Sequence, residues 1–304
     1  MSDLYGGVET GGTWCVCALG TGPGDLAAVE TFRTGAPAET IDRIVAFFSG
    51  QARPAAIGIG AFGPVDLHPA SPTWGYVTTT PKPGWAHTAL APVIRDRVGV
   101  PVAFDTDVNA AALGEHRWGA GRGAGTLCYV TVGTGIGAGI LIDGRPVHGL
   151  IHPEPGHLRI PHDRARDPFA GDCPRHGDCW EGLAAGGAIA ARWGTAAEDL
   201  PDDHPAWALE ADYLALGLVA LALVVSPHRV IAGGGVMERP GLLPVVRGRL
   251  RDLIGGYLAS PLLDADIADY VVAPALGDRA GVLGALALAA DLDRSGQAPD
   301  RSAI

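Results

Sequence analysis

The chain has 304 residues, of which 47% are apolar and 18% charged, so it is long and apolar enough to fold into one large domain or two domains of ordinary size. Its 45 glycines and 24 prolines predict many tight turns, and the apolar runs between them exclude a disordered chain. The net charge of −11, without a visible cluster of lysine and arginine, argues against a nucleic-acid partner and favours a small molecule.

The N-terminal residues contain no basic segment followed by an apolar one, so no secretory signal is predicted. The longest apolar run, residues 213–225, is too short to span a bilayer, and we expect no membrane partner. These features predict a cytoplasmic protein. In that reducing compartment, five cysteines favour free thiols or metal ligands over a disulfide framework.

Two segments are predicted to form similar hairpins. Residues 4–19 read as a strand, a Gly-Gly turn and a second strand, and residues 127–142 have the same order. Each turn is rich in glycine and carries a threonine, Thr13 in the first and Thr134 in the second. Each hairpin comes near the start of a comparable stretch of chain, which suggests two halves built on related plans.

The second hairpin has glycines at positions 133, 135, 137 and 139, a spacing that superficially matches a dinucleotide-binding motif. That motif requires a strand followed by a helix, whereas here a second strand follows. Glycine-rich turns can still bind phosphate, because backbone N–H groups converge there without Cβ atoms in the way. Either turn alone is equally compatible with a plain hairpin, but the two together favour a clamp for nucleotide phosphates.

The segment 104–119 places Asp107 where a strand ends and an alanine-rich helix begins. Aspartate is a favoured N-cap, so Asp107 could simply cap a helix that starts at Val108. A carboxylate at a strand end could also take part in chemistry, and the local pattern leaves both readings open.

Further along the chain, residues 55–69 predict a buried strand that ends in a Gly-Pro turn, and an amphipathic helix is expected near residues 90–98. Residues 207–225 predict a buried helix. Residues 228–243 predict a strand, three glycines and a helix. The glycines, Gly233–Gly235, could let a flat ligand such as adenine lie against the backbone, or could form an ordinary strand-to-helix turn.

Cys173, His176 and Cys179 are spaced three residues apart, so that one tight loop can present two thiolates and an imidazole to one ion. Zinc takes such sulfur and nitrogen ligands in a tetrahedron, and a fourth protein ligand would make the site structural. The alternatives are two buried thiols beside a surface histidine, or a disulfide between the two cysteines.

Six motifs in order resemble those of the ROK family of sugar kinases and sugar-responsive repressors. They are Glu9-Thr-Gly-Gly-Thr13, Gly63-Pro-Val-Asp66, Thr106-Asp-Val-Asn109, Gly133-Thr-Gly-Ile-Gly137, Glu154-Pro-Gly-His157 and the run from Cys173 to Glu181. The C-x-x-H-x-x-C form of the last motif, with Thr-Pro-Lys-Pro-Gly-Trp upstream, resembles the bacterial fructokinases of the family. The resemblance extends from Leu4 to about Leu288. One departure is Glu9, where the family usually has aspartate.

The resemblance implies an α/β fold with two domains of the actin-like ATPase (ribonuclease H-like) type, and with nucleotide and sugar in the cleft between them. Residues 1–117 would form the N-terminal domain. Residues 118–278 would form a larger C-terminal domain that contains a zinc loop at 157–179. A helix at about 279–293 would pack back on the N-terminal domain, and a homodimer is expected.

The implied activity is transfer of a phosphoryl group from ATP, with Mg²⁺, to the 6-hydroxyl of D-fructose, with structural Zn²⁺ elsewhere. The alternatives are a kinase for mannose, glucose or N-acetylmannosamine, or a ROK sensor that binds sugar without phosphorylating it. A sensor is disfavoured, because the first strand begins at about Leu4 and leaves no room for an N-terminal DNA-binding segment. Retention of Asp107 and of both phosphate hairpins points the same way.

The resemblance also assigns roles to individual residues. Asp107 would be the catalytic base. His157 would be the fourth zinc ligand, with His162 as a rival that is nearer in sequence to the cysteines. Asp105 or Asn109 could orient the sugar. The ATP-binding residues would be Gly11, Gly12, Thr13, Thr134, Gly135, Gly137, Gly233, Gly234 and Gly235. The sugar-binding residues would be Gly63, Pro64, Asn109, Glu154, His157 and Glu181.

Overall fold

The computed structural model describes residues 3–296. The chain divides into two compact units. Of the described residues, the N-terminal unit contains 3–122, 144–153 and 275–296, and the C-terminal unit contains 123–143 and 154–274. The domain limits expected at residues 117 and 278 stay predictions, and the segment 144–153 groups with the N-terminal unit.

The N-terminal unit is built on a five-stranded mixed sheet of order β3-β2-β1-β4-β7. β1 and β2 pair antiparallel, which confirms the first predicted hairpin, and β3 continues the antiparallel part. β4 and β7 join β1 in parallel. The strands are β1 (Tyr5–Thr10), β2 (Trp14–Gly22), β3 (Asp25–Arg33), β4 (Ile57–Ala61) and β7 (Val102–Thr106), and a separate small ribbon is formed by β5 (Tyr76–Val77) and β6 (Thr88–Ala89).

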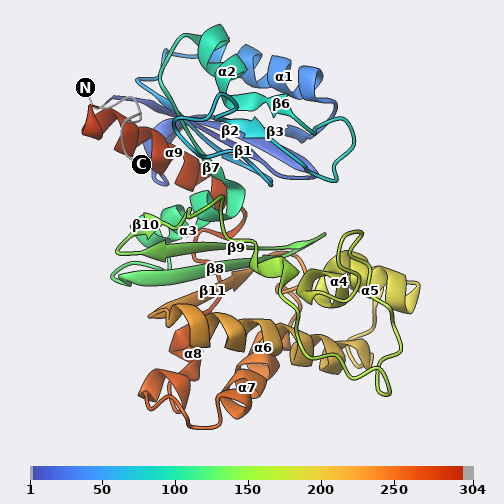
Figure 1. Ribbon diagram of the computed structural model, residues 1–304. Helices are drawn as coiled ribbons and strands as arrows, with labels where there is room; N and C mark the ends of the chain where they lie inside the picture. The colour runs from blue at the N-terminus through green and yellow to red at the C-terminus, as the bar shows by residue number, and fades with distance from the viewer. Residues whose placement is uncertain (1–2, 297–304) are drawn as a thin grey trace. The chain divides into compact units, whose positions relative to one another are not determined.

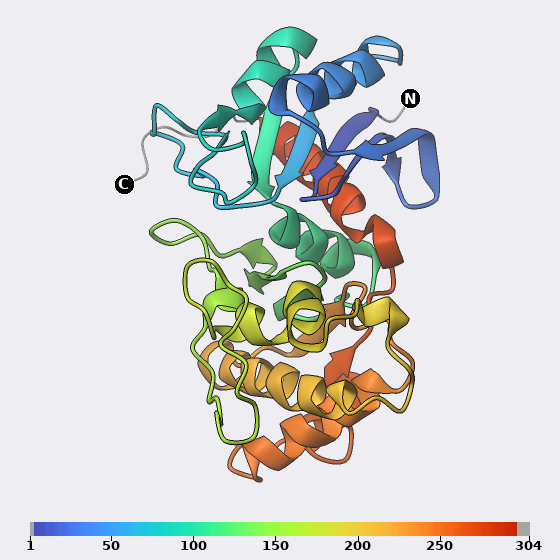
Figure 2. The ribbon, with the colours of Figure 1, turned by 90° about the vertical axis from the view of Figure 1, so that its right-hand side faces the viewer.

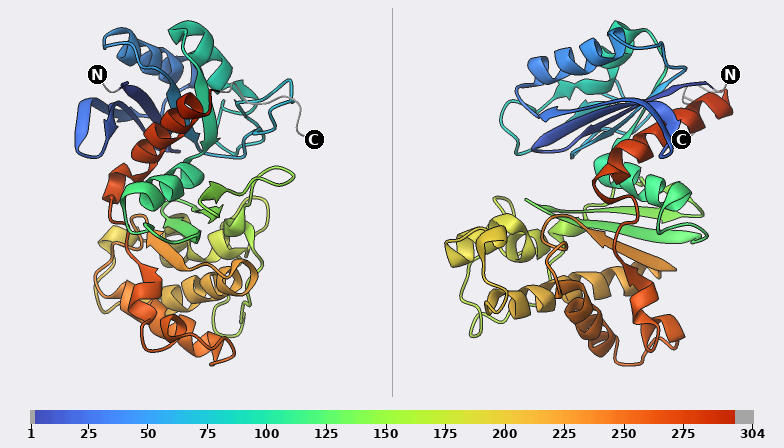
Figure 3. Two further views of the ribbon diagram at one scale, coloured as in Figure 1. Left: turned by 90° about the vertical axis from the view of Figure 1, so that its left-hand side faces the viewer. Right: turned by 180° about the vertical axis from the view of Figure 1, so that it is seen from behind.

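Helices cover both faces of this sheet (Figure 1). One face carries α1 (Pro37–Ser49) and α2 (Leu90–Val98), and α2 has the bounds expected from the sequence. The other face carries α3 (Asp107–Trp118) and α9 (Ala280–Ser295), which lie against each other, as Figure 3 also shows.

Glycine permits the close packing of α9. A Cβ atom added at Gly58 of β4 would lie 1.9 Å from the backbone oxygen of Ala285. One added at Gly284 would lie 1.6 Å from the backbone oxygen of Ala110 in α3. A side chain at Gly58 would therefore push α9 off the sheet, and one at Gly284 would push α9 away from α3. This packing fixes the start of α3, where Asp107 lies.

The C-terminal unit repeats the same strand plan. Within residues 123–143 and 154–274 its sheet has the order β9-β8-β11-β12, with β8 and β9 antiparallel and with β11 and β12 parallel to β8. The second predicted hairpin is therefore confirmed, and both sheets place a glycine-rich turn between their first two strands. The strands are β8 (Thr126–Val132), β9 (Ile136–Ile142), β11 (Arg229–Gly233) and β12 (Val271–Val272), and β10 (Arg145–Pro146) falls in the segment 144–153.

Figure 1 labels the helices of this unit, and Figure 2 shows them from another side. They are α4 (Trp180–Ala184), α5 (Gly186–Trp193), α6 (Ala206–Val225), α7 (Leu242–Ile254) and α8 (Ile267–Tyr270). Short 3₁₀ turns are η1 (Pro155–His157), η2 (Ala197–Asp199) and η3 (Pro261–Leu263) here, and η4 (Gly277–Arg279) in the N-terminal unit. α6 packs against α4 and α7.

The length argument against a membrane span was wrong for α6. The helix begins at Ala206, ahead of the apolar run noted in the sequence, and its 20 residues are long and apolar enough to cross a bilayer. Half of the apolar stretch of this helix is nevertheless buried inside the protein, as in a core helix. The expectation of no membrane partner stays a prediction.

Candidate functional site

The carboxylate of Asp107 lies at the junction of β7 and α3 and does not cap the helix. The N-cap is Thr106, whose hydroxyl accepts a hydrogen bond from the backbone N–H of Asn109 at 3.1 Å. The Asp107 Oδ1 atom accepts from the neighbouring N–H of Val108, at 2.8 Å. Because Thr106 is the N-cap, Asp107 is not needed in that role, although its Oδ1 atom also bonds an N–H of the first turn.

Burial raises the pKa of Asp107 to about 6, because the ionised carboxylate loses solvation. The N–H groups of Asp107 and Val108 oppose this shift. A carboxyl group with this pKa is ionised at neutral pH and is a better proton acceptor than an ordinary aspartate. The environment suits a general base.

Beside Asp107, a buried network holds the two residues expected to orient a sugar. Asp105 is 2% exposed, and its Oδ1 atom accepts from the Asn109 side-chain amide and from the Thr106 N–H, both at 2.8 Å. Its Oδ2 atom lies 2.8 Å from Nε2 of His148, whose pKa is raised chiefly by this hydrogen bond. Sequence reasoning missed His148, since 43 residues separate it from Asp105.

Glu9 projects from β1 toward the start of α9. Burial, and next the charge of Asp107, raise the pKa of Glu9 to about 8, whereas a backbone hydrogen bond from Val282 lowers it. Its Oε2 atom is buried and has no hydrogen-bond partner among the described residues. A Cβ atom at Gly281 would lie 2.3 Å from the Glu9 carboxyl carbon, so a glycine there makes room for this carboxyl group.

The turn from Gly11 to Thr13 lies at the surface, and hydrogen bonds from Thr34 fix its backbone. The Thr34 hydroxyl donates to the Gly11 oxygen at 2.8 Å, and the Thr34 N–H donates to the Thr13 oxygen at 2.9 Å. A Cβ atom added at Gly12 would meet no atom within 4 Å. Glycine at position 12 therefore leaves open space beside the turn, as a bound phosphate requires.

The predicted sugar-binding turn at Gly63 and Pro64 follows β4 and contains a cis peptide bond. The next backbone N–H, of Val65, donates to Nε2 of His152 at 3.1 Å. His148 and His152 thus attach the segment 144–153 to the two motifs of the N-terminal unit expected to bind the sugar.

In the C-terminal unit, the turn between β8 and β9 brings predicted ATP and sugar residues together. The Oε2 atom of Glu181 accepts from the backbone N–H of Ile136 at 3.0 Å. A Cβ atom at Gly135 would lie 2.4 Å from that oxygen, so only glycine lets Glu181 reach the turn. The turn containing Glu154 and His157 is equally close, because a Cβ atom at Gly156 would lie 1.9 Å from the Ile136 oxygen.

The three glycines after β11 have different surroundings. A Cβ atom at Gly233 would lie 2.4 Å from the Pro274 ring, and one at Gly234, where φ is +92°, would lie 2.5 Å from the Val132 oxygen. Packing alone explains these two glycines. Gly235 is exposed, and an added Cβ atom would meet nothing within 4 Å, so it is the one of the three that faces open space.

The C-terminal unit also contains the four residues expected to bind a metal ion. The side chains of His157, Cys173, His176 and Cys179 place one nitrogen or sulfur atom each within 4.8 Å of one another. The Cys173 sulfur lies 3.8 Å from Nδ1 of His157 and 3.6 Å from Nδ1 of His176, and the Cys179 sulfur lies 3.6 Å from Nδ1 of His157.

These separations suit zinc. A tetrahedron with Zn–S bonds of about 2.3 Å and Zn–N bonds of about 2.05 Å has S···N edges of about 3.6 Å. All five cysteines of the chain are free, so no disulfide joins Cys173 to Cys179. The donor set and its spacing fit a closed structural zinc site.

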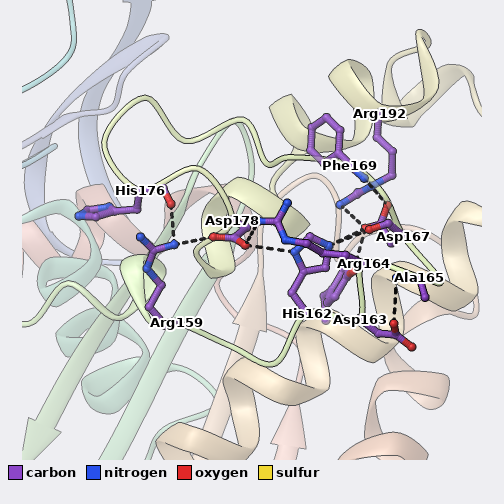
Figure 4. Close-up of polar contacts among 11 residues, drawn as sticks. Arg159, His162, Asp163, Arg164, Ala165, Asp167, Phe169, His176, Asp178 and Arg192 are labelled. Atoms are coloured by element: carbon purple, nitrogen blue, oxygen red, sulfur yellow. Dashed lines mark hydrogen bonds and ion pairs between the residues drawn. The ribbon is translucent and has the colours of Figure 1, made fainter.

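His162 lies outside the cluster and is engaged elsewhere (Figure 4). Its Nδ1 atom lies 3.2 Å from Asp178 Oδ2, and its Nε2 atom lies 2.9 Å from the Asp167 backbone oxygen. Arg159 connects this region to the metal loop, because its Nη1 atom donates to the His176 backbone oxygen at 2.6 Å and to Asp178 Oδ1 at 2.5 Å. His157, and not His162, accompanies the two thiols.

Comparisons with known proteins agree with these features. The model of the ROK family matches residues 5–292. The fructokinase of Zymomonas mobilis is 45% identical over 295 residues, which cover 94% of this chain and 96% of that protein. The structure of a ROK hexokinase from Thermus thermophilus matches with a TM-score of 0.78 at 26% identity. The match covers 96% of this chain and 100% of the hexokinase chain.

The structure of a ROK family glucokinase from Streptomyces griseus, in complex with glucose and AMPPNP, has a TM-score of 0.76 at 30% identity. The match covers 95% of this chain and 99% of the glucokinase chain. The two sheets of related plan described above are those of the two-domain actin-like ATPase fold, as the resemblance implied. The chain belongs to the ROK family.

Proposed function

We propose that this protein is an ATP-dependent fructokinase, which transfers the γ-phosphoryl group of ATP to the 6-hydroxyl of D-fructose and releases fructose 6-phosphate and ADP. The observation that carries the proposal is the near full-length similarity to a fructokinase at 45% identity. The carboxylate of Asp107, with its pKa raised to about 6, supplies the group that such a reaction needs.

Phosphoryl transfer to a sugar demands positioning more than covalent chemistry. Asp107 would accept the proton of the sugar hydroxyl as that oxygen attacks the γ-phosphorus of Mg²⁺–ATP. Asn109 and Asp105, fixed by their mutual hydrogen bond at 2.8 Å, would orient the sugar. Gly63, Pro64, Glu154, His157 and Glu181 would complete its binding site.

The two glycine-rich turns would bind the nucleotide. Gly11, Gly12 and Thr13 form one, and Thr134, Gly135 and Gly137 belong to the other. Open space beside Gly12 and Gly235 supports a ligand at those positions. Gly233 and Gly234 would act by shaping the backbone that presents Gly235, because their own Cβ positions are filled by protein atoms.

Zinc bound by His157, Cys173, His176 and Cys179 would be structural, since four protein ligands leave no open position. It would hold the loop 173–179, which leads directly into α4 and Glu181. We further propose that the protein is a cytoplasmic homodimer. Five free thiols are consistent with a reducing compartment, and light scattering of the purified protein would measure the subunit number.

The test is a coupled assay of ADP release with Mg²⁺–ATP and a panel of fructose, mannose, glucose and N-acetylmannosamine. The expected result is the highest kcat/KM with fructose. Turnover with a different sugar would replace the substrate and keep the kinase. A folded protein that binds a sugar and releases no ADP would indicate a sensor instead.

A further inference from the structure

Lys82 is the only lysine in the chain, in which the other 21 basic residues are arginines. It lies in the loop between β5 and β6 of the N-terminal unit. That loop is anchored by Trp85, a fully buried residue whose Nε1–H donates to the Gly35 oxygen at 3.0 Å and whose ring packs against Phe62 at 5.0 Å. The backbone that carries Lys82 is therefore fixed.

The ammonium group of Lys82 reaches the exposed turn between β1 and β2. Its Nζ atom donates to the backbone oxygen of Gly12 at 2.5 Å, across 70 residues of sequence. The same atom lies 6.0 Å from the centre of the Phe62 ring, just before the Gly63-Pro64 turn. The lysine thus connects the turn expected to bind phosphate with the strand end expected to bind sugar.

With Lys82, every carbonyl of the turn has a donor. Thr34 bonds the oxygens of Gly11 and Thr13, and Lys82 bonds that of Gly12 between them. In a trans peptide the C=O and the following N–H point in opposite directions. Three fixed carbonyls therefore direct the N–H groups of Gly12, Thr13 and Trp14 away from the donors, and the Lys82 contact sets the direction of the Thr13 N–H.

The positive charge of Lys82 would also favour phosphate binding at this turn. The acidic groups Glu9 and Asp107 belong to this unit, and a nucleotide triphosphate would bring further negative charge to it. The other basic group near the turn, Arg33, stacks on the Trp14 ring at 4.3 Å. Lys82 is the cation that contacts the turn backbone directly, and its compact ammonium suits a single carbonyl better than a planar guanidinium would.

We propose that Lys82 is a positioning residue of the ATP phosphate site: its ammonium holds the Gly12 carbonyl, directs the Thr13 N–H toward the phosphates, and adds positive charge beside them. This inference rests on the proposed kinase function, and specifically on ATP binding at the Gly11–Thr13 turn. It does not depend on which sugar is the acceptor.

The single lysine allows a direct test on the unmodified protein. Pyridoxal 5′-phosphate followed by borohydride labels amines, so peptide mapping would report only Lys82 and the chain terminus. The expected result is that Mg²⁺–ATP protects Lys82 from labelling while fructose alone protects it much less. Equal labelling with and without ATP would overturn the proposal.

The variants Lys82→Met and Lys82→Arg separate charge from shape, and Arg33→Met is the matched control. We expect Lys82→Met to raise the Kd for AMPPNP roughly 10- to 100-fold, since a charge-assisted hydrogen bond is lost, and to leave the Kd for fructose within about twofold. Lys82→Arg should recover part of the ATP affinity, and Arg33→Met should change it little. An unchanged AMPPNP Kd in Lys82→Met, or a loss confined to fructose, would contradict the inference.

The experiments distinguish a failure of the proposed fructokinase function from a failure of the proposed role of Lys82. A wild-type protein that binds AMPPNP and protects Lys82, yet turns over no fructose, would leave Lys82 in place and remove only the proposed acceptor. A wild-type protein that binds no ATP would refute both.

Discussion

The hydroxyl of Thr106 caps α3 by accepting the backbone N–H of Asn109 at 3.1 Å, which leaves the adjacent Asp107 carboxylate available for another purpose. An aspartate at a helix start has two readings that sequence alone cannot separate. Here the two roles belong to neighbouring residues, so mutation can separate them.

We expect Asp107→Asn to fold and to bind ATP, while kcat falls about 10²- to 10⁴-fold, because the amide cannot take the proton. Thr106→Ala should instead lower the free energy of unfolding by about 1 kcal/mol, the usual contribution of an N-cap, and Thr106→Ser should restore it. Denaturant unfolding and steady-state kinetics of the three variants measure both effects. Near-normal turnover in Asp107→Asn would exclude it as the base.

The raised pKa of Asp107 predicts a pH dependence. The base must be ionised, and its pKa is about 6, so kcat/KM should be constant above that pH and fall toward tenfold per unit below it. An aspartate of ordinary pKa, about 3.9, would keep nearly full activity down to about pH 5. The measurement is kcat/KM for fructose from pH 5 to 8, with zinc content determined at each end to exclude metal loss. A kcat/KM that stays constant down to pH 5 would show that the group that must be ionised is not an Asp107 with a raised pKa.

Loss of the metal site should be selective for its four ligands. Wild-type protein is expected to contain about one zinc per chain, and Cys179→Ser should lose it and melt at a lower temperature, because a structural site stabilises the fold. His162→Gln is the matched control and should keep its zinc, since both ring nitrogens of His162 are bonded away from the cluster. Metal analysis of the two variants decides the point; zinc loss in His162→Gln would show that the ligand set is wrong.

Alanine substitutions at the neighbouring glycines Gly234 and Gly235, after β11, should have different effects. Gly234→Ala forces an L-residue to φ of +92° and brings its Cβ atom 2.5 Å from the Val132 oxygen. The positive φ alone costs about 1–2 kcal/mol, so the variant should be clearly less stable. Gly235→Ala should fold normally, because its Cβ atom meets nothing within 4 Å, and should bind AMPPNP more weakly. Calorimetric Tm and AMPPNP titration distinguish the pair, and tight nucleotide binding by Gly235→Ala would place adenine elsewhere.

Much of the local structure could be predicted from the sequence. Glycine-rich turns between apolar strands predicted both hairpins, and the helix at Leu90–Val98 followed from its amphipathic spacing. These features depend on residues close together in the chain, where propensity and periodicity dominate. The helix predicted at residues 207–225 is confirmed as α6, Ala206–Val225. Only the apolar run used to judge a membrane span was shorter than the helix, because Glu210 and Asp212 interrupt it.

The sequence by itself determined which chemical groups the chain possesses: a carboxylate after β7, two phosphate-type turns and a thiol-imidazole loop. Only the tertiary structure decided how they pair. It placed His157 beside Cys173, His148 beside Asp105, and Lys82 on Gly12, partners whose sequence positions differ by 16, 43 and 70. Such contacts depend on strand register and on how closely helices approach the sheets, and the glycines that permit that approach are recognisable only when the opposing backbone is known.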